Sequence, residues 1–144
     1  MNGTAMHAEK LDLPDGDVIF YPAFFTKEAS DGYFQTLADT IDWGQERINL
    51  FGKSIEAPRL IAWYGDPGKS YSYSRVKHEP LPWNEPLLAI KHDIEMVCEA
   101  AFNSVLLNFY RSERDSVSWH SDDEPELGEN PVIGSVSFGG SRTF

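Results

Sequence analysis

Two side chains with metal-binding chemistry stand two positions apart in the segment WHSDDE, which covers residues 119–124. His120 offers an imidazole nitrogen and Asp122 a carboxylate oxygen. In an extended chain, residues i and i+2 point to the same face, so the two donors can meet at one metal ion. A site of two histidines and one carboxylate leaves three positions open, which suits Fe(II), O₂ and a bidentate co-substrate.

The same residues have two other readings. A bare His-x-Asp spacing occurs more often in a solvated acidic loop, with an incidental histidine, than in a metal site. A calcium-binding EF-hand loop is a third option, but its ligand spacing does not match and Gly128 falls at the wrong place. The spacing alone therefore leaves the metal site open.

The elements that must position these residues can be predicted from periodicity. The spacing predicts one helix over about 27–40 capped by Thr26, and a second that begins at Asn84 and runs to about Ala101. Residues 45–65 read as two strands joined by a turn at 51–53. Strands are predicted at 17–25, 104–110, 116–120 and 132–138, and residues 1–16 are polar and expected to be flexible. The pattern is typical of one α+β domain over 17–144, with helices beside a β-sandwich or jelly roll.

Bulk composition narrows the class of protein. The 144 residues suit a single globular domain, and the net charge of −11 argues against a broad basic surface for nucleic acid, though not against a local basic groove. Cys98 is the single cysteine, which weakly favours a reducing compartment. We expect a monomer without membrane association, located inside the cell: in the cytoplasm of a bacterium, or in the cytoplasm or nucleus of a eukaryote.

The final segment, SVSFGGSRTF, reads as a strand, a Gly-Gly turn and the start of another strand. A domain rarely ends partway into an apolar strand that has no partner. We therefore expect the sequence to be a fragment that lacks carboxyl-terminal strands.

The region LLNFYRSERDSVSWHSDDEPELGENPVIGSVSFGGSRTF closely resembles the AlkB family of Fe(II)/2-oxoglutarate-dependent dioxygenases, in particular the animal-type homologues two and three. The resemblance extends back through PRLIAWYGDPGKSYSYS and covers about 43–144. It implies a double-stranded β-helix (jelly-roll) fold and oxidative dealkylation with Fe(II) and 2-oxoglutarate as cofactor and co-substrate. The resemblance favours a metal site at His120 and Asp122 over a solvated acidic loop.

The resemblance also assigns residues. His120 and Asp122 match the first two iron ligands of the family, and Asn108 and Tyr110 match the polar pair that contacts 2-oxoglutarate. An amide and a phenol on one strand face can hold carboxylate oxygens, although two polar positions in an ordinary strand are the alternative. The family's third ligand, a histidine, and its 2-oxoglutarate arginine have no counterpart here. We therefore expect the chain as written to bind iron weakly and to lack normal activity.

Substrate residues follow in the same way. The resemblance implies that SYSYS contacts a flipped base through Tyr71, Tyr73 and Ser74, although such tyrosines also pack on sheet edges. Asp123 and Glu124 match an acidic pair beside the iron, where carboxylates would favour a cationic methylated base such as 1-methyladenine or 3-methylcytosine.

Phe51 lies in the turn INLFGKS, which resembles the hydrophobic finger of the family member that prefers duplex DNA. An exposed Phe51 could wedge into a base stack, whereas a buried one would belong to the core. The segments around PRLIAWYG and YRSERDSVSWH instead resemble the member that prefers single strands. Five basic residues are candidates for phosphate contacts: Lys53, Arg59, Arg75, Arg111 and Arg114.

The sequence thus predicts a fragment of an enzyme that demethylates alkylated bases in DNA, and so repairs alkylation damage. RNA, protein or lipid substrates are alternatives, as is a nucleic-acid or protein-binding module that keeps the fold without catalysis.

Overall fold

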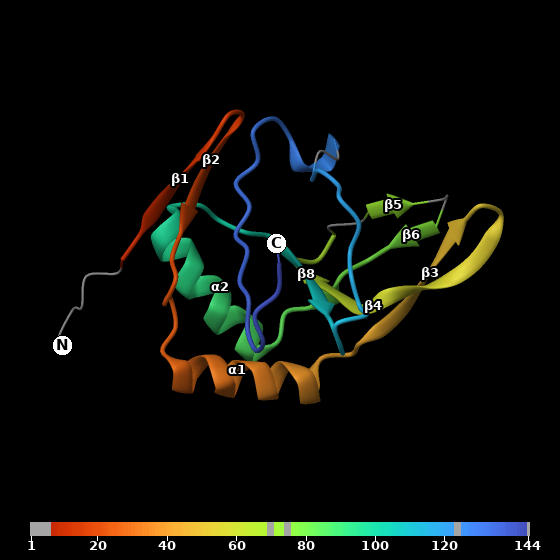
Figure 1. Cartoon of the computed structure of the whole chain (residues 1–144), viewed down its shortest axis with the longest axis horizontal. Coiled ribbons are helices and arrows are strands. Elements are labelled where there is room, and N and C mark those ends of the chain that lie inside the picture. Colours follow the sequence, from red (N-terminus) through yellow and green to blue (C-terminus); the bar gives the residue numbers. More distant parts are fainter. Residues whose placement is uncertain (1–6, 69–70, 74–75, 123–124, 144) are drawn as a thin grey trace. The chain divides into compact units, whose positions relative to one another are not determined.

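The computed structural model describes residues 7–68, 71–73, 76–122 and 125–143, and contains both strands and helices (Figure 1). The strands are β1 (Glu9–Leu13), β2 (Gly16–Phe20), β3 (Gly44–Leu50), β4 (Lys53–Gly65), β5 (Tyr71–Tyr73), β6 (Val76–His78), β7 (Leu81–Pro82) and β8 (Ser104–Phe109). The helices are α1 (Lys27–Thr40), α2 (Glu85–Cys98) and a short 3₁₀ turn at Pro125–Leu127. The described residues fall into two compact units, one within 7–35 and 137–143 and one within 36–136.

The first unit contains the antiparallel β1–β2 hairpin and a cluster of aromatic rings. The segment expected to be flexible thus includes a strand, because Leu11 and Leu13 pair opposite Val18 and Gly16 around the turn at 14–15. Edge-to-face and tilted ring contacts, with centroids 4.8–6.1 Å apart, join five side chains. These are Tyr21, Phe24, Phe25, Tyr33 and Phe138.

The predicted start of the first helix is confirmed. Thr26 Oγ1 accepts a hydrogen bond from Ala29 N at 3.2 Å, which satisfies one of the unpaired N–H groups of the first turn. Leu37 is buried on this helix, and Ile41 is buried directly after it. Asp42 N then donates to the Tyr64 hydroxyl at 3.2 Å, so the chain that leaves α1 is tied to β4.

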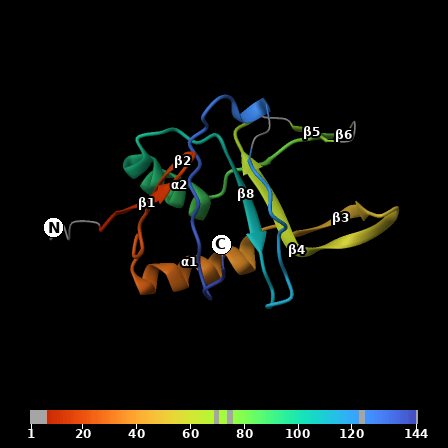
Figure 2. The same cartoon turned by 45° about the horizontal axis from the view of Figure 1, so that its top comes forward.

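The second unit is built around β4. β3 pairs with its first part and β7 with its end, while β8 runs antiparallel along residues 60–65 of β4 on the other side. The predicted hairpin at residues 45–65 is confirmed, and both views show it extending beyond β8 (Figures 1 and 2). The buried side chains of β4 are Ala57, Ala62 and Tyr64. The observed mixture of helices and mixed sheets agrees with the predicted α+β class.

A bulge interrupts the hairpin. Gln45 is paired with Leu60, but the next pair is Arg47 with Glu56, so β4 carries extra residues at this point. Pro58 lies within the bulge, where the loss of a backbone N–H breaks no regular ladder bond. At the bulge, backbone carbonyls of β4 accept hydrogen bonds from a side chain instead of from the regular ladder.

The second helix begins as predicted and ends earlier. Asn84 Oδ1 accepts from Leu87 N at 3.1 Å. The last residue of the helix is Cys98, three residues before the predicted end at about Ala101, and Glu99 follows it with a left-handed φ of 50°. The strand predicted at 104–110 is confirmed as β8. The strands predicted at 116–120 and 132–138 are wrong: both segments are irregular, because no neighbouring strand pairs with them within the described structure.

No helix in the described part of the chain is both long and apolar enough to span a membrane.

Candidate metal and co-substrate site

His120 and Asp122 lie close together in the irregular segment that follows β8. His120 Nε2 is 3.4 Å from Asp122 Oδ1, and the two side chains are 56% and 48% exposed. Two donors that share one metal at bond lengths near 2.1 Å stand about 3 Å apart when they occupy neighbouring positions. The observed separation is therefore compatible with one cation held by both.

The other nitrogen of His120 defines its tautomer. Nδ1 is 2.8 Å from the backbone oxygen of Ser118, and a carbonyl oxygen can only accept. Nδ1 therefore carries the hydrogen, and Nε2 can present a lone pair toward Asp122 and a metal. Metal-binding histidines commonly have their second nitrogen bonded in this way.

The donor set in the described residues stops at this pair. No cluster of three or more His, Cys, Asp or Glu side chains with metal-binding geometry occurs among the residues that the structure places. His120 and Asp122 thus fit part of a facial metal site.

Asn108 lies on β8, opposite Ile61 of β4. Arg59 Nε donates to Asn108 Oδ1 at 2.9 Å, and because a guanidinium can only donate, this contact fixes the orientation of the amide. The two N–H donors of Asn108 then remain for an acceptor such as a carboxylate. Tyr110 follows directly after β8 and is half-buried.

Phe51 is 97% exposed at the tip of the β3–β4 hairpin, so the core alternative is excluded. Its φ of 48° and that of Gly52 at 76° form the tight turn between the strands. The backbone of Tyr71 and Tyr73 lies in β5, which pairs with β6. The predicted residues Ser74, Asp123 and Glu124, like Arg75, lie outside the described residues.

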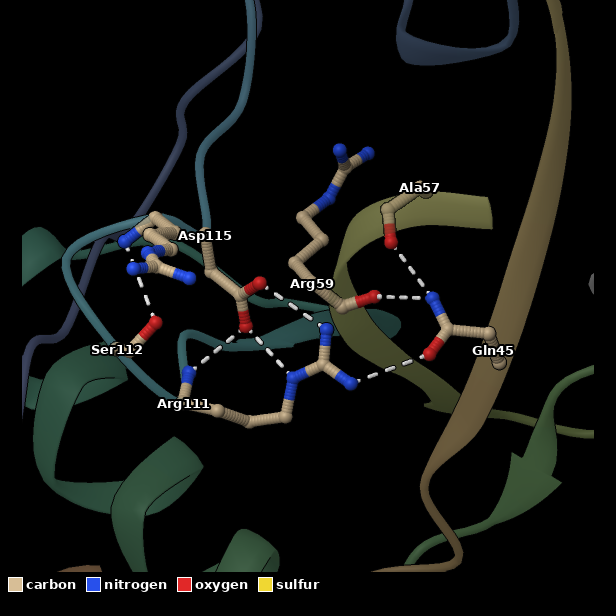
Figure 3. Close-up of polar contacts among 7 residues, drawn as sticks. Gln45, Ala57, Arg59, Arg111, Ser112 and Asp115 are labelled. Carbon is tan, nitrogen blue, oxygen red and sulfur yellow. Dashed lines mark hydrogen bonds and ion pairs between the residues drawn. The ribbon is translucent and has the colours of Figure 1, made fainter. Parts of the chain in front are cut away.

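Sequence reasoning missed a polar cluster at the bulge (Figure 3). Asp115 accepts from Arg111 Nε at 2.7 Å, Arg111 Nη2 at 3.0 Å and Arg111 N at 2.9 Å. Arg111 Nη1 also donates to Gln45 Oε1 at 3.3 Å. Gln45 Nε2 donates to the carbonyls of Ala57, at 2.6 Å, and Arg59, at 3.3 Å.

Two of the residues predicted to contact phosphates instead bind groups within the protein. Arg111 is held by Asp115, which raises the pKa of the guanidinium further, and Arg59 is engaged by Asn108 and lies 3.9 Å from Glu46. The sequence offered one indication of this ion pair, which is the i,i+4 spacing of Arg111 and Asp115. It did not show that Asp115 is buried, with only 6% of its surface exposed.

Comparison with known proteins gives one family. Residues 17–144 match the family model described as the 2OG-Fe(II) oxygenase superfamily. The protein named alpha-ketoglutarate-dependent dioxygenase alkB homolog 3 from Rattus norvegicus is 46% identical over 128 residues, which cover 88% of this chain and 43% of the relative. Its Homo sapiens counterpart is 44% identical over 88% of this chain and 44% of the relative.

A second group of relatives is also similar. The Homo sapiens protein named DNA oxidative demethylase ALKBH2 is 37% identical over 142 residues, which cover 96% of this chain and 52% of that protein. The chain therefore spans about half the length of the curated relatives that it matches.

Proposed function

Because the chain belongs to the 2OG-Fe(II) oxygenase superfamily and is similar to AlkB homologues, we propose that it is the metal-binding part of a dioxygenase that removes methyl groups from nucleobases, preferentially in DNA. The observation that carries the proposal is the His120–Asp122 pair, in which Nε2 and Oδ1 are 3.4 Å apart and Nδ1 is bonded to Ser118. The name of one relative, a DNA oxidative demethylase, supports DNA as the substrate class.

Each residue group has a distinct role in the proposed site. His120 and Asp122 would hold Fe(II), and Asn108 and Tyr110 would bind the carboxylate oxygens of 2-oxoglutarate. Bound Fe(II) with 2-oxoglutarate would supply oxidation of the methyl carbon by O₂. Asn108 is suited to its role because Arg59 leaves its two N–H donors for an anionic acceptor.

The base-binding part of the proposal rests on the sequence resemblance together with the exposed tip of the hairpin. Tyr71, Tyr73 and Ser74 would hold the flipped base, and Asp123 and Glu124 would favour a cationic one. Phe51 would contact the base stack from the hairpin tip, where it is 97% exposed.

The decisive experiment measures metal binding and demethylation in two separate assays. Binding of Mn(II), as a stable probe for Fe(II), is measured by the electron paramagnetic resonance signal of the free ion, for the 144-residue chain and for His120→Ala. His7→Ala is the matched control, because it removes an exposed histidine outside the proposed site. We expect His120→Ala to abolish saturable Mn(II) binding and His7→Ala to retain it.

In parallel, oligonucleotides that carry 1-methyladenine in DNA or RNA are incubated with Fe(II), 2-oxoglutarate, ascorbate and the longer dioxygenase of which this chain is proposed to be a part, and loss of the methyl mass is followed. Methyl loss from RNA but not DNA would change the substrate class. Equal Mn(II) binding by wild type and His120→Ala would overturn the ligand assignment and with it the proposed function.

A further inference from the structure

Asp115 is the only buried charged residue among those that the structure describes, with 6% of its surface exposed. A buried carboxylate is costly unless charge-assisted hydrogen bonds compensate for the lost hydration. Arg111 supplies three donors to Asp115: its backbone N and two guanidinium nitrogens, at 2.7–3.0 Å. The pair is bidentate, which fixes direction as well as distance.

The turn that contains this pair is attached to the sheet at both of its ends. At one end, Phe109 is paired with Leu60 of β4, and Arg111 follows two residues later. At the other end, Ser116 N donates to the carbonyl of Pro58 at 2.8 Å. Pro58 lies within the bulge, where β3 and β4 lose their regular register.

Arg111 extends the attachment to β3. Its Nη1 donates to Gln45 Oε1 at 3.3 Å, and the amide nitrogen of Gln45 in turn donates to the bulge carbonyls of Ala57 and Arg59 (Figure 3). The carboxylate, guanidinium and amide therefore form one continuous series of bonds from the turn to both strands of the hairpin. Every member is planar and directional, so the series resists rotation of the turn.

The turn held by these hydrogen bonds lies in the sequence between two pairs of proposed ligand-binding residues. Tyr110 directly precedes Arg111, and His120 follows Asp115 by five residues. The turn therefore lies between the residues proposed for 2-oxoglutarate and those proposed for the metal. We propose that Asp115 is a positioning residue, which, through Arg111 and Gln45, fixes the metal pair relative to the co-substrate pair so that each ligand strengthens binding of the other.

This inference rests on the proposed function and goes further, since it assigns the coupling between the two ligands to a carboxylate that touches neither. Asp115→Asn keeps the size of the side chain but turns one oxygen into an N–H group that faces the donors of Arg111. The bidentate contact with Arg111 is then lost, so the orientation of the turn is no longer fixed. The pairing of β4 with β8 is kept.

The test measures coupling. The Mn(II) dissociation constant is determined by electron paramagnetic resonance with and without saturating 2-oxoglutarate, at a temperature where circular dichroism shows each variant to be folded. Coupling between two ligands is typically about 5- to 150-fold in affinity, and we expect wild type to lie within this range. For Asp115→Asn the ratio of the two constants should fall toward one.

Glu113→Gln is the matched control, because it removes one negative charge from an exposed side chain in the same turn. It should keep the wild-type ratio. If Asp115→Asn does not fold, Arg111→Lys decides, since lysine keeps the positive charge but cannot form the bidentate contact. Arg111→Lys should also lower the ratio.

The outcomes separate the two proposals. A wild-type ratio in Asp115→Asn, or in Arg111→Lys where it alone folds, would overturn the positioning role and leave the proposed function intact. An equal fall in Glu113→Gln would also overturn it, because loss of charge would then explain the effect. Mn(II) binding that is unchanged by His120→Ala would overturn the proposed function and this inference together.

Discussion

The amide of Asn108 has one acceptor oxygen, and Arg59 Nε occupies it at 2.9 Å. Both N–H donors of the same amide remain available, and they suit an anionic partner. For His120 the available atom is an acceptor, because the Ser118 carbonyl accepts the Nδ1 hydrogen and leaves the lone pair of Nε2 for the proposed metal. At the residue scale, neighbours that take no part in chemistry decide which atom of a functional side chain is available.

Phe51 carries the first prediction at this scale. Because its ring is 97% exposed, Phe51→Ala should change the free energy of unfolding by less than about 0.5 kcal/mol. It should weaken binding to duplex oligonucleotides more than to single strands, since a wedge acts only on a stacked duplex. Fluorescence anisotropy with both substrates would measure this, with Ile55→Ala, another exposed apolar residue of the hairpin, as control. Equal weakening on both substrates would contradict a wedge.

Glu95 gives a prediction for pH. Its carboxylate accepts from Phe102 N at 2.7 Å and from Lys91 Nζ at 2.9 Å, and these contacts, the backbone one first, lower the pKa of Glu95. A lowered folded-state pKa contributes stability above the unfolded pKa of about 4.3, and this contribution disappears as pH falls through the folded value.

Wild type should therefore be more stable than Glu95→Gln at pH 7, and the difference should shrink as acid protonates the carboxylate below about pH 4. Urea unfolding across this range measures it. Asp93→Asn serves as control, because it removes a carboxylate from the same helix. A difference between wild type and Glu95→Gln that stays constant with pH would contradict the assignment.

At the scale of elements, β4 organises the second unit because β3, β7 and β8 all pair with it. Its end is closely packed: Gly65 is buried, and a Cβ there would lie 2.8 Å from the Asn103 carbonyl and 2.9 Å from Ser104 Cβ. The segment that enters β8 can approach β4 this closely only because Gly65 has no side chain.

Gly65→Ala should therefore destabilise the protein by about 1–3 kcal/mol, the usual cost of overpacking. Gly16→Ala is the control, since nothing lies within 4 Å of the added methyl group. Its effect should stay within about 0.5 kcal/mol of wild type. The midpoints of urea unfolding compare the two, and equal midpoints for both variants would show that β8 shifts to accommodate the methyl group.

At the scale of the whole molecule, the dominant electrostatic feature is the net charge of −11. Exposed ion pairs such as Lys10–Asp17 contribute little, so self-repulsion should outweigh them at low ionic strength. The proposed nucleic-acid substrate would then have to be recognised through local cations and aromatic contacts, because the overall field repels it. Proposed substrate contacts such as Phe51 are consistent with that requirement.

Raising NaCl from about 20 mM to about 300 mM should therefore stabilise the protein, because screening shortens the range of repulsion from roughly 20 Å to below 10 Å. Urea is the appropriate denaturant, since guanidinium chloride is itself a salt. A lower urea midpoint at high salt would mean that favourable ion pairs outweigh repulsion. Sucrose at matched osmolality would control for general solute effects.

The sequence by itself determined both helix starts and the β3–β4 hairpin, and it supplied the candidate metal donors. Thr26 and Asn84 cap their helices through short-range hydrogen bonds, and the hairpin around Phe51 follows from local turn geometry. The spacing of His120 and Asp122 brought two metal donors within 3.4 Å, since residues two apart need little help from the rest of the fold.

Only the tertiary structure decided the features that depend on distant neighbours. Residues 116–120 and 132–138 alternate like strands but are irregular, because a strand also needs a partner. The burial of Asp115 and its connection to Gln45 were likewise hidden, since Arg111 and Gln45 are 66 positions apart and meet only across the bulge of β4. Periodicity reports the face on which a residue lies, whereas partners, burial and the remaining hydrogen-bonding capacity depend on which segments the fold brings together.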